Sequence, residues 1–433
     1  MENTRKSPKF WLSLIIFSLV GQVAWVVENM YLNVFIYKMF SASAEAISLM
    51  VGASSVAATL TTLLIGALSD KLGKRKIFIC GGYICWGISI FSFGLIREEW
   101  LAPLFPAVSA ASVGISAVII LDCLMTFFGS AANDACFNAW LTDSTDETNR
   151  GAAEGLNAMM PLVAILAVFG GFMGLDQSLP ESWTIIFFII GGVVLVLGVL
   201  GFFLITEPKV DTTENQQFWK NLTYGFRPGV IKANPRLYLT LIAYAVFGIS
   251  INIFMPYLIL YYEKSLQMTN YVFIFAPAII LAAAFTAVYG KVYDKKGFAA
   301  SVFPVLGLLM AGYVLLYLFR NTAPVFIGTV LMLCGYLSGM AVFGAMLRDH
   351  TPEHMSGMFQ GQRIICQVLL PGIIGPAIGA AVLKNAEQIM DGDGRMVFLP
   401  NANIFLAALI AAVFIFLALM PLMKDLKGKS HAE

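Results

Sequence analysis

Charged residues are scarce in this chain of 433 residues: aspartate, glutamate, lysine and arginine together make up only 12% of it. A soluble domain carries about 25% of these residues. The present chain is instead 59% hydrophobic, with a mean hydropathy of +0.80. These values predict an integral membrane protein. The net charge of +1 provides no basic surface for nucleic acid, so we expect no nucleic-acid partner.

Residues that commonly hold metals or perform catalysis are also few. The chain has three histidines and six cysteines, and the cysteines fall in apolar runs without metal-ligand spacing. There is no nucleophile–base constellation and no phosphate-binding loop. We therefore expect no enzyme, no nucleotide-driven pump, no metal and no cofactor. A cleavable signal peptide is not predicted either, because the first apolar run, from Phe10, is long enough to span a membrane.

Long apolar runs are what the chain does have. A spanning helix needs about 20 apolar residues. Twelve runs meet this length: 10–37, 46–69, 77–96, 109–141, 153–175, 183–206, 237–262, 271–293, 298–319, 323–347, 357–383 and 401–423. Pro103 and Pro106 precede the fourth run and predict a bent or re-entrant piece there. The fold class predicted is therefore an all-α polytopic membrane protein with twelve transmembrane helices.

One substantial hydrophilic segment, 207–236, divides the twelve runs into six and six. It contains Phe218-Trp219-Lys220 and predicts a cytoplasmic linker with a short amphipathic helix at the membrane surface. We expect one six-helix domain over 1–206 and a second over 237–433.

Basic residues are unequally divided between the two sides of the predicted membrane. If the N-terminus is inside, 20 of the 27 lysines and arginines lie in inner segments and 6 in outer loops, with Arg363 inside a run. Because inner loops carry an excess of basic residues, both termini are predicted to be cytoplasmic. We expect the protein in the cell membrane.

The loop between the second and third runs reads Gly66-Ala-Leu-Ser-Asp70-Lys-Leu-Gly73-Lys74-Arg75-Lys76. Gly66 allows two helix backbones to approach closely, Gly73 permits a sharp reversal, and the basic residues hold the loop at the cytoplasmic face. This pattern resembles the signature loop of the major facilitator superfamily of secondary transporters. The resemblance implies two pseudo-symmetric six-helix bundles, and an Asp70 that faces the start of the eleventh helix near Gly357 and latches one end state.

Two later segments repeat features of the first half. Gly290-Lys-Val-Tyr-Asp294-Lys-Lys-Gly297 follows the segment 66–73 by 224 residues, although Phe298 interrupts the basic run. Arg348-Asp349-His-Thr351 follows Thr142-Asp143-Ser-Thr145 by 206 residues. Matching loops in the same order predict a transporter built from repeats, with its site between the halves near the bilayer midplane.

Polar residues inside the runs are the best pointers to function, since a charge at a helix centre costs about 2.5–3.5 kcal/mol. In the first run Gln22, Trp25, Asn29 and Asn33 recur at spacings of 3, 4 and 4 residues. They share one helix face, and Glu28 lies at its edge. A polar stripe beside a carboxylate favours a water-filled cavity over simple helix–helix hydrogen bonding. Trp25 also offers an apolar ring on which a sugar could stack.

The fourth run carries a second polar face. Asp122, Thr126, Gly129 and Asn133 recur at spacings of 4, 3 and 4 residues, and Asp134 lies nearer the cytoplasm. Asp122 is in the middle of the run and must face protein or water. This face is a second candidate wall of the cavity.

In the eleventh run Gln360, Arg363 and Gln367 follow spacings of 3 and 4 residues, and the guanidinium needs a carboxylate or sugar-like oxygen as partner. Helices 1, 4, 7 and 10 line the cavity in the superfamily that the chain resembles, which adds Asn252 and Tyr336, although Asn252 can equally be structural. The predicted solute-binding residues are Gln22, Trp25, Asn29, Asn33, Asp122, Asn133, Asn252, Tyr336, Arg363 and Gln367.

Three acidic residues, Glu28, Asp122 and Asp134, are candidates for coupling transport to a cation. An unneutralised carboxylate in a low-dielectric span favours its protonated form, which predicts proton coupling. Glu28 is preferred because it adjoins the polar stripe of the first run, whereas Arg363 can hold Asp122 ionised.

Two stretches resemble a particular branch of the superfamily. The stretch from Phe128-Gly-Ser-Ala-Ala-Asn133 to Asp143 resembles the fourth helix of glycoside–pentoside–hexuronide cation symporters, and Gly21-Gln-Val-Ala-Trp25 resembles the first helix of sucrose-type proton symporters. The resemblance implies a sugar or glycoside as solute, with Asp134 near a sugar-contacting carboxylate. Sodium-using members carry paired carboxylates in the second helix, where residues 46–69 offer only threonines at that depth. A proton is therefore favoured over sodium.

Two other functions stay open. Gly375-Pro376-Ala-Ile-Gly379 resembles part of an antiporter signature, but in the eleventh helix instead of the fifth, so a proton-coupled drug or metabolite exporter is one alternative. A lipid-transporting or sensor protein on the same scaffold is the other. The expected partners are a small solute and the lipid bilayer, with the chain acting as a monomer.

Overall fold

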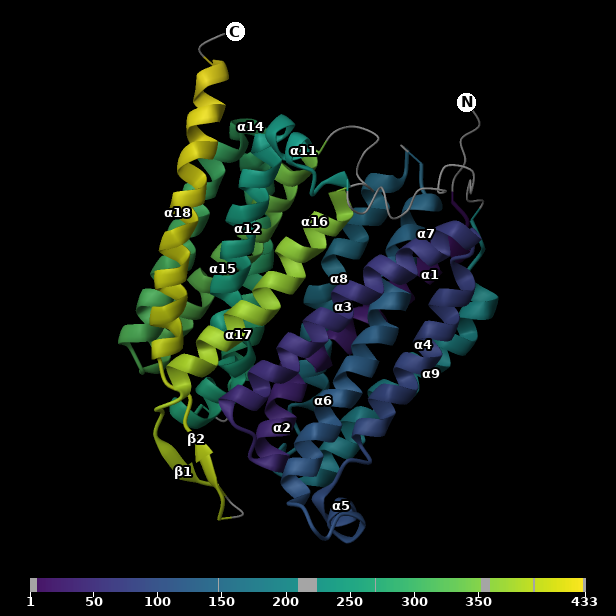
Figure 1. Ribbon diagram of the computed structural model, residues 1–433, viewed down its shortest axis with the longest axis vertical. Coiled ribbons are helices and arrows are strands. Elements are labelled where there is room, and N and C mark those ends of the chain that lie inside the picture. The colour runs from purple at the N-terminus through teal and green to yellow at the C-terminus, as the bar shows by residue number, and fades with distance from the viewer. Residues whose placement is uncertain are drawn as a thin grey trace. The chain divides into compact units, whose positions relative to one another are not determined.

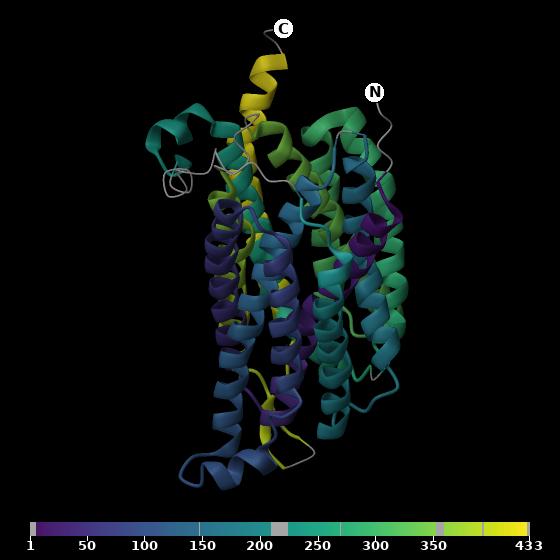
Figure 2. The same ribbon diagram turned by 90° about the vertical axis from the view of Figure 1, so that its right-hand side faces the viewer.

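The computed structural model describes residues 6–146, 148–208, 224–268, 270–351, 359–391 and 394–430. Long helices dominate these residues, with one small β-hairpin (Figures 1 and 2). The chain divides into two units. Unit 1 comprises Met1–Ala42 and Ala53–Phe218, and unit 2 comprises Ser43–Gly52 and Trp219–Glu433, so that α3 contributes to both.

The elements from the N-terminus to the linker are α1 (Pro8–Val26), η1 (Val27–Tyr31), α2 (Leu32–Phe40), α3 (Ala44–Leu72), α4 (Lys76–Phe93), α5 (Glu98–Leu104), α6 (Ala110–Gly129), η2 (Ser130–Phe137), α7 (Asn138–Asp143), α8 (Arg150–Phe172) and α9 (Pro180–Leu204). Proline at the first helical position of α1 and α9 removes a backbone N–H that would have no partner there. Ser7 caps α1 by accepting a hydrogen bond from the Phe10 backbone N–H at 3.3 Å.

After the linker come α11 (Pro228–Ala233), α12 (Pro235–Phe254), η3 (Met255–Tyr257), α13 (Leu258–Leu260), η4 (Tyr261–Ser265), α14 (Val272–Leu318), α15 (Thr322–His350), α16 (Gln360–Ile364), η6 (Ile365–Leu369), α17 (Leu370–Leu383), β1 (Gln388–Met390), β2 (Met396–Phe398) and α18 (Asn403–Ser430). The predicted amphipathic segment at 218–220 lies outside the described residues. Within the described part of the linker, the structure has the short helix α11.

Eleven helical segments in the described residues are long and apolar enough to cross a membrane. One of them, α14, has 47 residues and covers both the eighth and the ninth predicted runs. Its backbone leaves the helical conformation at Gly297, where φ is 71°. The Tyr289 hydroxyl donates to the Ser301 carbonyl at 2.9 Å, so the chain folds back on itself across this glycine. Allowing for this reversal, the predicted runs and the observed helices agree along the described chain, which confirms the all-α membrane fold.

Apolar side chains cover much of the outward surface of these helices. Leu60 on α3, Ile120 on α6, Phe203 on α9 and Leu417 on α18 are all exposed. A water-soluble protein rarely exposes contiguous apolar surface on this scale. The outer faces of the long helices are therefore suited to lipid.

Two short elements lie between spanning helices. Where Pro103 and Pro106 predicted a bent piece before the fourth run, the structure has a separate short helix, α5, with Pro103 inside it and Pro106 just after it. This helix lies at the end of unit 1 opposite the start of α1 (Figure 1). Between α17 and α18, β1 and β2 pair antiparallel with Ile389 opposite Val397. Asp391 accepts a hydrogen bond from the Arg395 backbone N–H at 2.7 Å, which closes this hairpin.

Candidate functional site

Several spanning helices contain π-helical segments, in which the backbone hydrogen bond joins residues five apart. In the described residues these are η1, η2, η4 and η6. Such segments are uncommon and are frequently found at functional sites. Three of them carry residues predicted from the sequence: Glu28 and Asn29 in η1, Asn133 and Asp134 in η2, and Gln367 in η6.

Glu28 and Asp122 are two buried carboxyl groups inside the spanning helices of unit 1. Glu28, on η1, is 8% exposed, and its Oε1 accepts a hydrogen bond from the Thr126 hydroxyl on α6 at 2.7 Å. Asp122, one turn before Thr126 on α6, is 2% exposed and hydrogen-bonded by Ser54 of α3. Glu28 Oε2 and Asp122 Oδ1 are both buried without a hydrogen-bond partner. The two carboxyl groups are thus half satisfied, each by a single hydroxyl.

Within unit 1, neither carboxyl group has a cationic partner among the described residues. The charged groups whose electrostatic influence reaches Glu28 are Asp122 and Asp134, all of one sign. The ion pairs found in unit 1 lie at the ends of its helices, around Asp146, Arg75 and Arg97. An uncompensated buried charge is very costly, which makes this pair the candidate of unit 1 for binding a proton.

Asp134 lies on the same helix as Asp122, about three turns further along. It is half-buried, and its Oδ2 accepts a hydrogen bond from the Ser130 hydroxyl at 3.0 Å. Asn138 donates to the Asp134 backbone carbonyl at 3.1 Å, which leaves the carboxyl group to Ser130. Asp134 is therefore the more accessible of the three acidic residues.

Asn133 joins helices of unit 1 through a chain of hydrogen bonds. Its Oδ1 accepts from Trp25 Nε1 at 3.3 Å, and its Nδ2 donates to the Tyr83 hydroxyl at 2.8 Å, which in turn donates to the Phe17 carbonyl at 2.8 Å. A Cβ at Gly21 would collide with the Asn133 amide and the Tyr83 hydroxyl, so a larger residue there would displace this chain of hydrogen bonds. These bonds position Asn133 and Trp25. Only the donor and acceptor sites of the Asn133 amide that these bonds leave free can bind a solute.

The predicted polar stripe of the first helix is not uniform in the structure. Gln22 and Trp25 are half-buried, Asn29 is exposed and Asn33 is buried. Asn29 Nδ2 donates to the Trp25 carbonyl, and Asn33 Nδ2 to the Asn29 carbonyl, both at 2.8 Å. The two amides thus satisfy backbone carbonyls beside the π-helical segment, while Asn33 Oδ1 has no partner.

In unit 2 the candidates come from α12, α15, α16 and η6. Asn252 Nδ2 donates to the Gly248 carbonyl of its own helix at 2.9 Å, and Tyr336 and Gln367 are half-buried. Arg363 is half-buried one turn from the start of α16, and the groups acting on it are Tyr244 and Arg348. Arg363 therefore lies near one end of its spanning segment, Gly361–Leu383.

The signature loop is organised by Arg75, a role that the sequence did not reveal. Arg75 is 4% exposed, and its guanidinium contacts Asp70 Oδ1 at 2.5 Å and Asp143 Oδ2 at 2.9 Å. Burial lowers the pKa of Arg75, but the charge of Asp70 and the hydrogen bond with Asp143 outweigh it, so the net pKa is raised. The prediction that this arginine holds the loop at the membrane face is not tested, and the structure adds that its buried side chain pairs with Asp70 and Asp143 at the ends of two helices.

Glu207 completes the loop from the far end of α9. Its Oε1 accepts hydrogen bonds from the backbone N–H groups of Arg75 at 2.5 Å and Lys76 at 3.2 Å, at the N-terminus of α4. An anion is favoured at that helix end. Lys74 is exposed and Gly73 has a φ of 61°, as a sharp turn requires. The expected contact of Asp70 with Gly357 lies outside the described residues.

Gly66 is not required for space in the structure. A Cβ at this position would lie 3.8 Å from the Ala135 Cβ, which is an ordinary van der Waals contact. Alanine would therefore fit as well at this approach of two helices.

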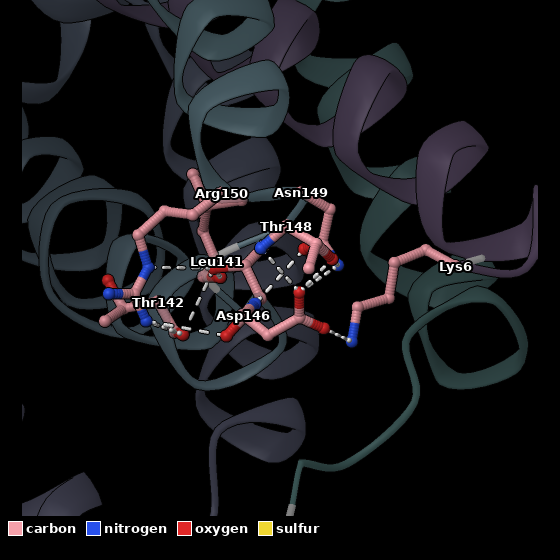
Figure 3. Close-up of polar contacts among 8 residues, drawn as sticks. Lys6, Leu141, Thr142, Asp146, Thr148, Asn149 and Arg150 are labelled. Carbon is pink, nitrogen blue, oxygen red and sulfur yellow. Dashed lines mark hydrogen bonds and ion pairs between the residues drawn. The ribbon is translucent and has the colours of Figure 1, made fainter. Parts of the chain in front are cut away.

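The loop between α7 and α8 is held by a second polar cluster (Figure 3). Asp146 Oδ1 accepts from the Thr148 backbone N–H at 3.0 Å and from Asn149 Nδ2 at 2.7 Å, and its Oδ2 pairs with Lys6 at 3.3 Å. The hydrogen bonds from Thr148 and then Asn149 hold the pKa of Asp146 well below its usual value. Arg150 donates to Thr145 Oγ1 at 3.4 Å. This cluster fixes the N-terminal segment onto the loop.

The repeated loops of unit 2 use different chemistry. Gly297 has a φ of 71°, matching the turn at Gly73. Asp294, the counterpart of Asp70, is exposed. Asp349, the counterpart of Asp143, accepts a hydrogen bond from the Tyr293 hydroxyl at 2.5 Å. A neutral donor thus replaces the arginine of the first half.

These features define a polytopic α-helical membrane protein with repeated loop motifs and ionisable groups inside its spans. The profile of the Major Facilitator Superfamily matches residues 10–376, and the chain belongs to this superfamily. Its members are transporters, so the chain is a membrane transporter and not an enzyme. A search of curated proteins gave no match.

Solved structures of transporters share the fold. The chain is similar to a mutant of the nucleoside transporter NupG, with a TM-score of 0.72, 13% identity and coverage of 95% of this chain and 99% of that chain. It is similar to a bacterial homolog of the human lysosomal transporter Spinster (TM-score 0.70, 16% identity, 97% and 99% covered). A D-xylose-proton symporter gives a TM-score of 0.66 at 14% identity, with 94% and 97% covered. Identities this low speak for the fold alone.

Proposed function

We propose that this chain is a proton-coupled symporter that moves a small solute, most simply a sugar or glycoside, by alternating access. The observation that carries the proposal is the Glu28–Asp122 pair: two buried carboxyl groups, each with one oxygen lacking a partner, and no cation beside them among the described residues of unit 1. Such a pair binds and releases a proton when solvent access changes. Glu28 is the coupling group we favour, because it adjoins Trp25 and Asn29.

The sugar part of the proposal rests on resemblance and on one neighbour. The stretch from Phe128 to Asp143 resembles glycoside–pentoside–hexuronide cation symporters, and a structure of similar fold is a D-xylose-proton symporter. We propose a monomer in the cell membrane with cytoplasmic termini, based on the excess of basic residues in the inner segments. A thermal-shift screen against sugars, at two pH values and with or without sodium, would identify the solute and the ion.

The decisive experiment measures proton movement. Purified protein in liposomes containing a pH-sensitive dye is given xylose, sucrose or a methyl glycoside, and the internal pH is followed. We expect solute-dependent acidification with the wild type. Glu28→Gln mimics the protonated state, so it should lose uphill accumulation yet retain solute exchange down a gradient.

Glu181→Gln is a suitable control, since Glu181 is an exposed acid paired with Arg97 at 3.1 Å. If Glu28→Gln accumulates solute with the wild-type pH dependence, Glu28 is a structural acid and coupling lies elsewhere.

Export is the rival function. Its sequence support was Gly375-Pro376, and these residues pack in the structure: the Pro376 carbonyl accepts from the Tyr257 hydroxyl at 3.3 Å, and Gly375 lies against Asn252. A packing role accounts for both residues. Solute exchange in liposomes would also separate a solute transporter from a lipid transporter or a sensor, because neither of these moves sugar.

A further inference from the structure

The connection between α4 and α6 in unit 1 is charged first and then apolar. Arg97, Glu98 and Glu99 follow the end of α4, and no charged residue appears after them until Asp122. The short helix α5 begins within this charged group and ends at Leu104. The charged residues therefore lie only at the first end of the connection, and the rest of it has no charged side chain.

The charged end is fixed to the neighbouring helix. Arg97 Nη1 pairs with Glu181 Oε1 at 3.1 Å, and Nη2 donates to Thr184 Oγ1 at 2.7 Å, both at the start of α9. The Arg97 guanidinium also lies over the Trp100 ring, 5.1 Å from its centroid. The beginning of α5 is thus held in place at the end of unit 1.

The apolar end is uncovered. Exposed fractions are 47% for Trp100, 71% for Leu104, 45% for Phe105 and 56% for Val108, and no residue of α5 is buried. Trp100 and Leu104 are four residues apart and share a face of the helix. The turn that follows is ordered, with the Val108 backbone N–H donating to the Phe105 carbonyl at 3.2 Å. Four large apolar side chains are therefore presented by a defined backbone.

The chain connectivity of residues 100–108 places their apolar surface close to the bilayer. The connection joins the ends of two spanning helices, α4 and α6, so it lies within a few residues of the bilayer boundary. The exposed side chains Ile88 and Leu95 carry the apolar surface of α4 up to the charged group. Tryptophan and arginine both serve as anchors at the membrane–water interface, and an interfacial helix buries its apolar face about 5–10 Å into the boundary between headgroups and acyl chains.

We propose that α5 and the turn after it, residues 100–108, bind the bilayer surface at the end of unit 1 opposite Gly73. Lipids of that leaflet cover Trp100, Leu104, Phe105 and Val108, while Arg97 and Glu99 remain at the level of water. A second copy of the chain is the other possible cover, but the lipid is adjacent whether or not another copy is present.

Photo-crosslinking of the full chain in phospholipid vesicles tests this proposal. The photoreactive residue p-benzoylphenylalanine replaces Leu104 in one variant and Val108 in a second, which guards against failure of either variant to fold. Glu99 is replaced in the matched control, since it is exposed on the same helix. After illumination, mass spectrometry should find at least fivefold more phospholipid adduct at positions 104 and 108 than at position 99.

Adducts to a second copy of the chain at positions 104 and 108 would overturn the proposal in favour of a self-association surface. Phospholipid adducts no more frequent than at position 99 would overturn it as well, because the segment would then stand in water.

Discussion

Gly73 and Gly66 stand seven residues apart in the signature loop, and the structure gives them different importance. Gly73 has a φ of 61°, a left-handed conformation that costs other residues about 1–2 kcal/mol. Gly66 has room for a Cβ. We expect Gly73→Ala to lower the free energy of unfolding by about 1 kcal/mol, and Gly66→Ala to leave it unchanged or to raise it slightly. Thermal unfolding in detergent measures both, and equal losses would contradict the assignment.

Asp146 supplies a pH dependence at the residue scale. Hydrogen bonds from Thr148 and Asn149 lower its pKa in the folded state, so its contribution to stability is complete above the unfolded value of about 4 and is lost as the pH falls below it. Thermal unfolding of the wild type should therefore shift to lower temperature in acid. Asp146→Asn should reduce this acid sensitivity, and Glu154→Gln, at an exposed position on α8, should not. An unchanged pH profile in Asp146→Asn would contradict the role of Asp146.

At the scale of elements, Arg75 links the ends of several helices through Asp70, Asp143 and the backbone contact with Glu207. Removing the guanidinium leaves two partly exposed carboxylates without their cation, so Arg75→Ala should cost about 1.5–3 kcal/mol. Arg75→Lys should retain only part of this stabilisation, because an ammonium group keeps the charge but cannot contact both acids as the planar guanidinium does. Lys74→Ala is the control, since Lys74 is exposed. A double-mutant cycle of Arg75 with Asp143 measures the coupling, and a value near zero would refute the pairing.

The helices themselves could be predicted, because an apolar run of about 20 residues has few alternatives in a membrane. The π-helical segments could not, since an i to i+5 bond depends on what packs around the helix and not on a local pattern. The consequence is visible at Asn29 and Asn33, which a regular helix places on one face but which are exposed and buried respectively. Glu28 and Asp122 were found singly by their cost in a span. Their convergence with Thr126 and Ser54 required knowledge of how three helices pack.

Across the whole molecule, the two halves repeat positions without repeating chemistry. In unit 1, Arg75 contacts both Ser69 and Asp143, whereas in unit 2 Tyr293, the counterpart of Ser69, contacts Asp349 directly. The longer phenol takes the place of a serine and an arginine. The repeated sequence motif identified both Asp143 and Asp349. Because position 299, the counterpart of Arg75, is not basic, the sequence did not indicate that Asp349 also has a hydrogen-bond partner.

This substitution can be tested by reversal. Tyr293→Phe should lower the free energy of unfolding by about 0.5–1.5 kcal/mol, the usual value of one hydrogen bond. Tyr293→Ser combined with Ala299→Arg should recover stability relative to Tyr293→Ser alone, because it rebuilds the arrangement of unit 1. Tyr317→Phe serves as a control for loss of a hydroxyl elsewhere on α14. If the arginine gives no recovery, the two loops are not equivalent in structure.

The reversal at Gly297 also has a consequence for biosynthesis. Four charged residues, Lys291, Asp294, Lys295 and Lys296, lie within seven positions before the glycine, with apolar helix on both sides. The two halves of α14, before and after Gly297, are joined by a tight turn without a flexible loop. As the chain leaves the ribosome, the first half therefore cannot insert across the bilayer long before the second. Residues 272–318 should therefore enter the membrane as one helical hairpin whose charged tip never crosses. An Asn-X-Ser acceptor placed beside the tip would then escape glycosylation in microsomes, while acceptors placed near Val272 and Leu318 would be modified together.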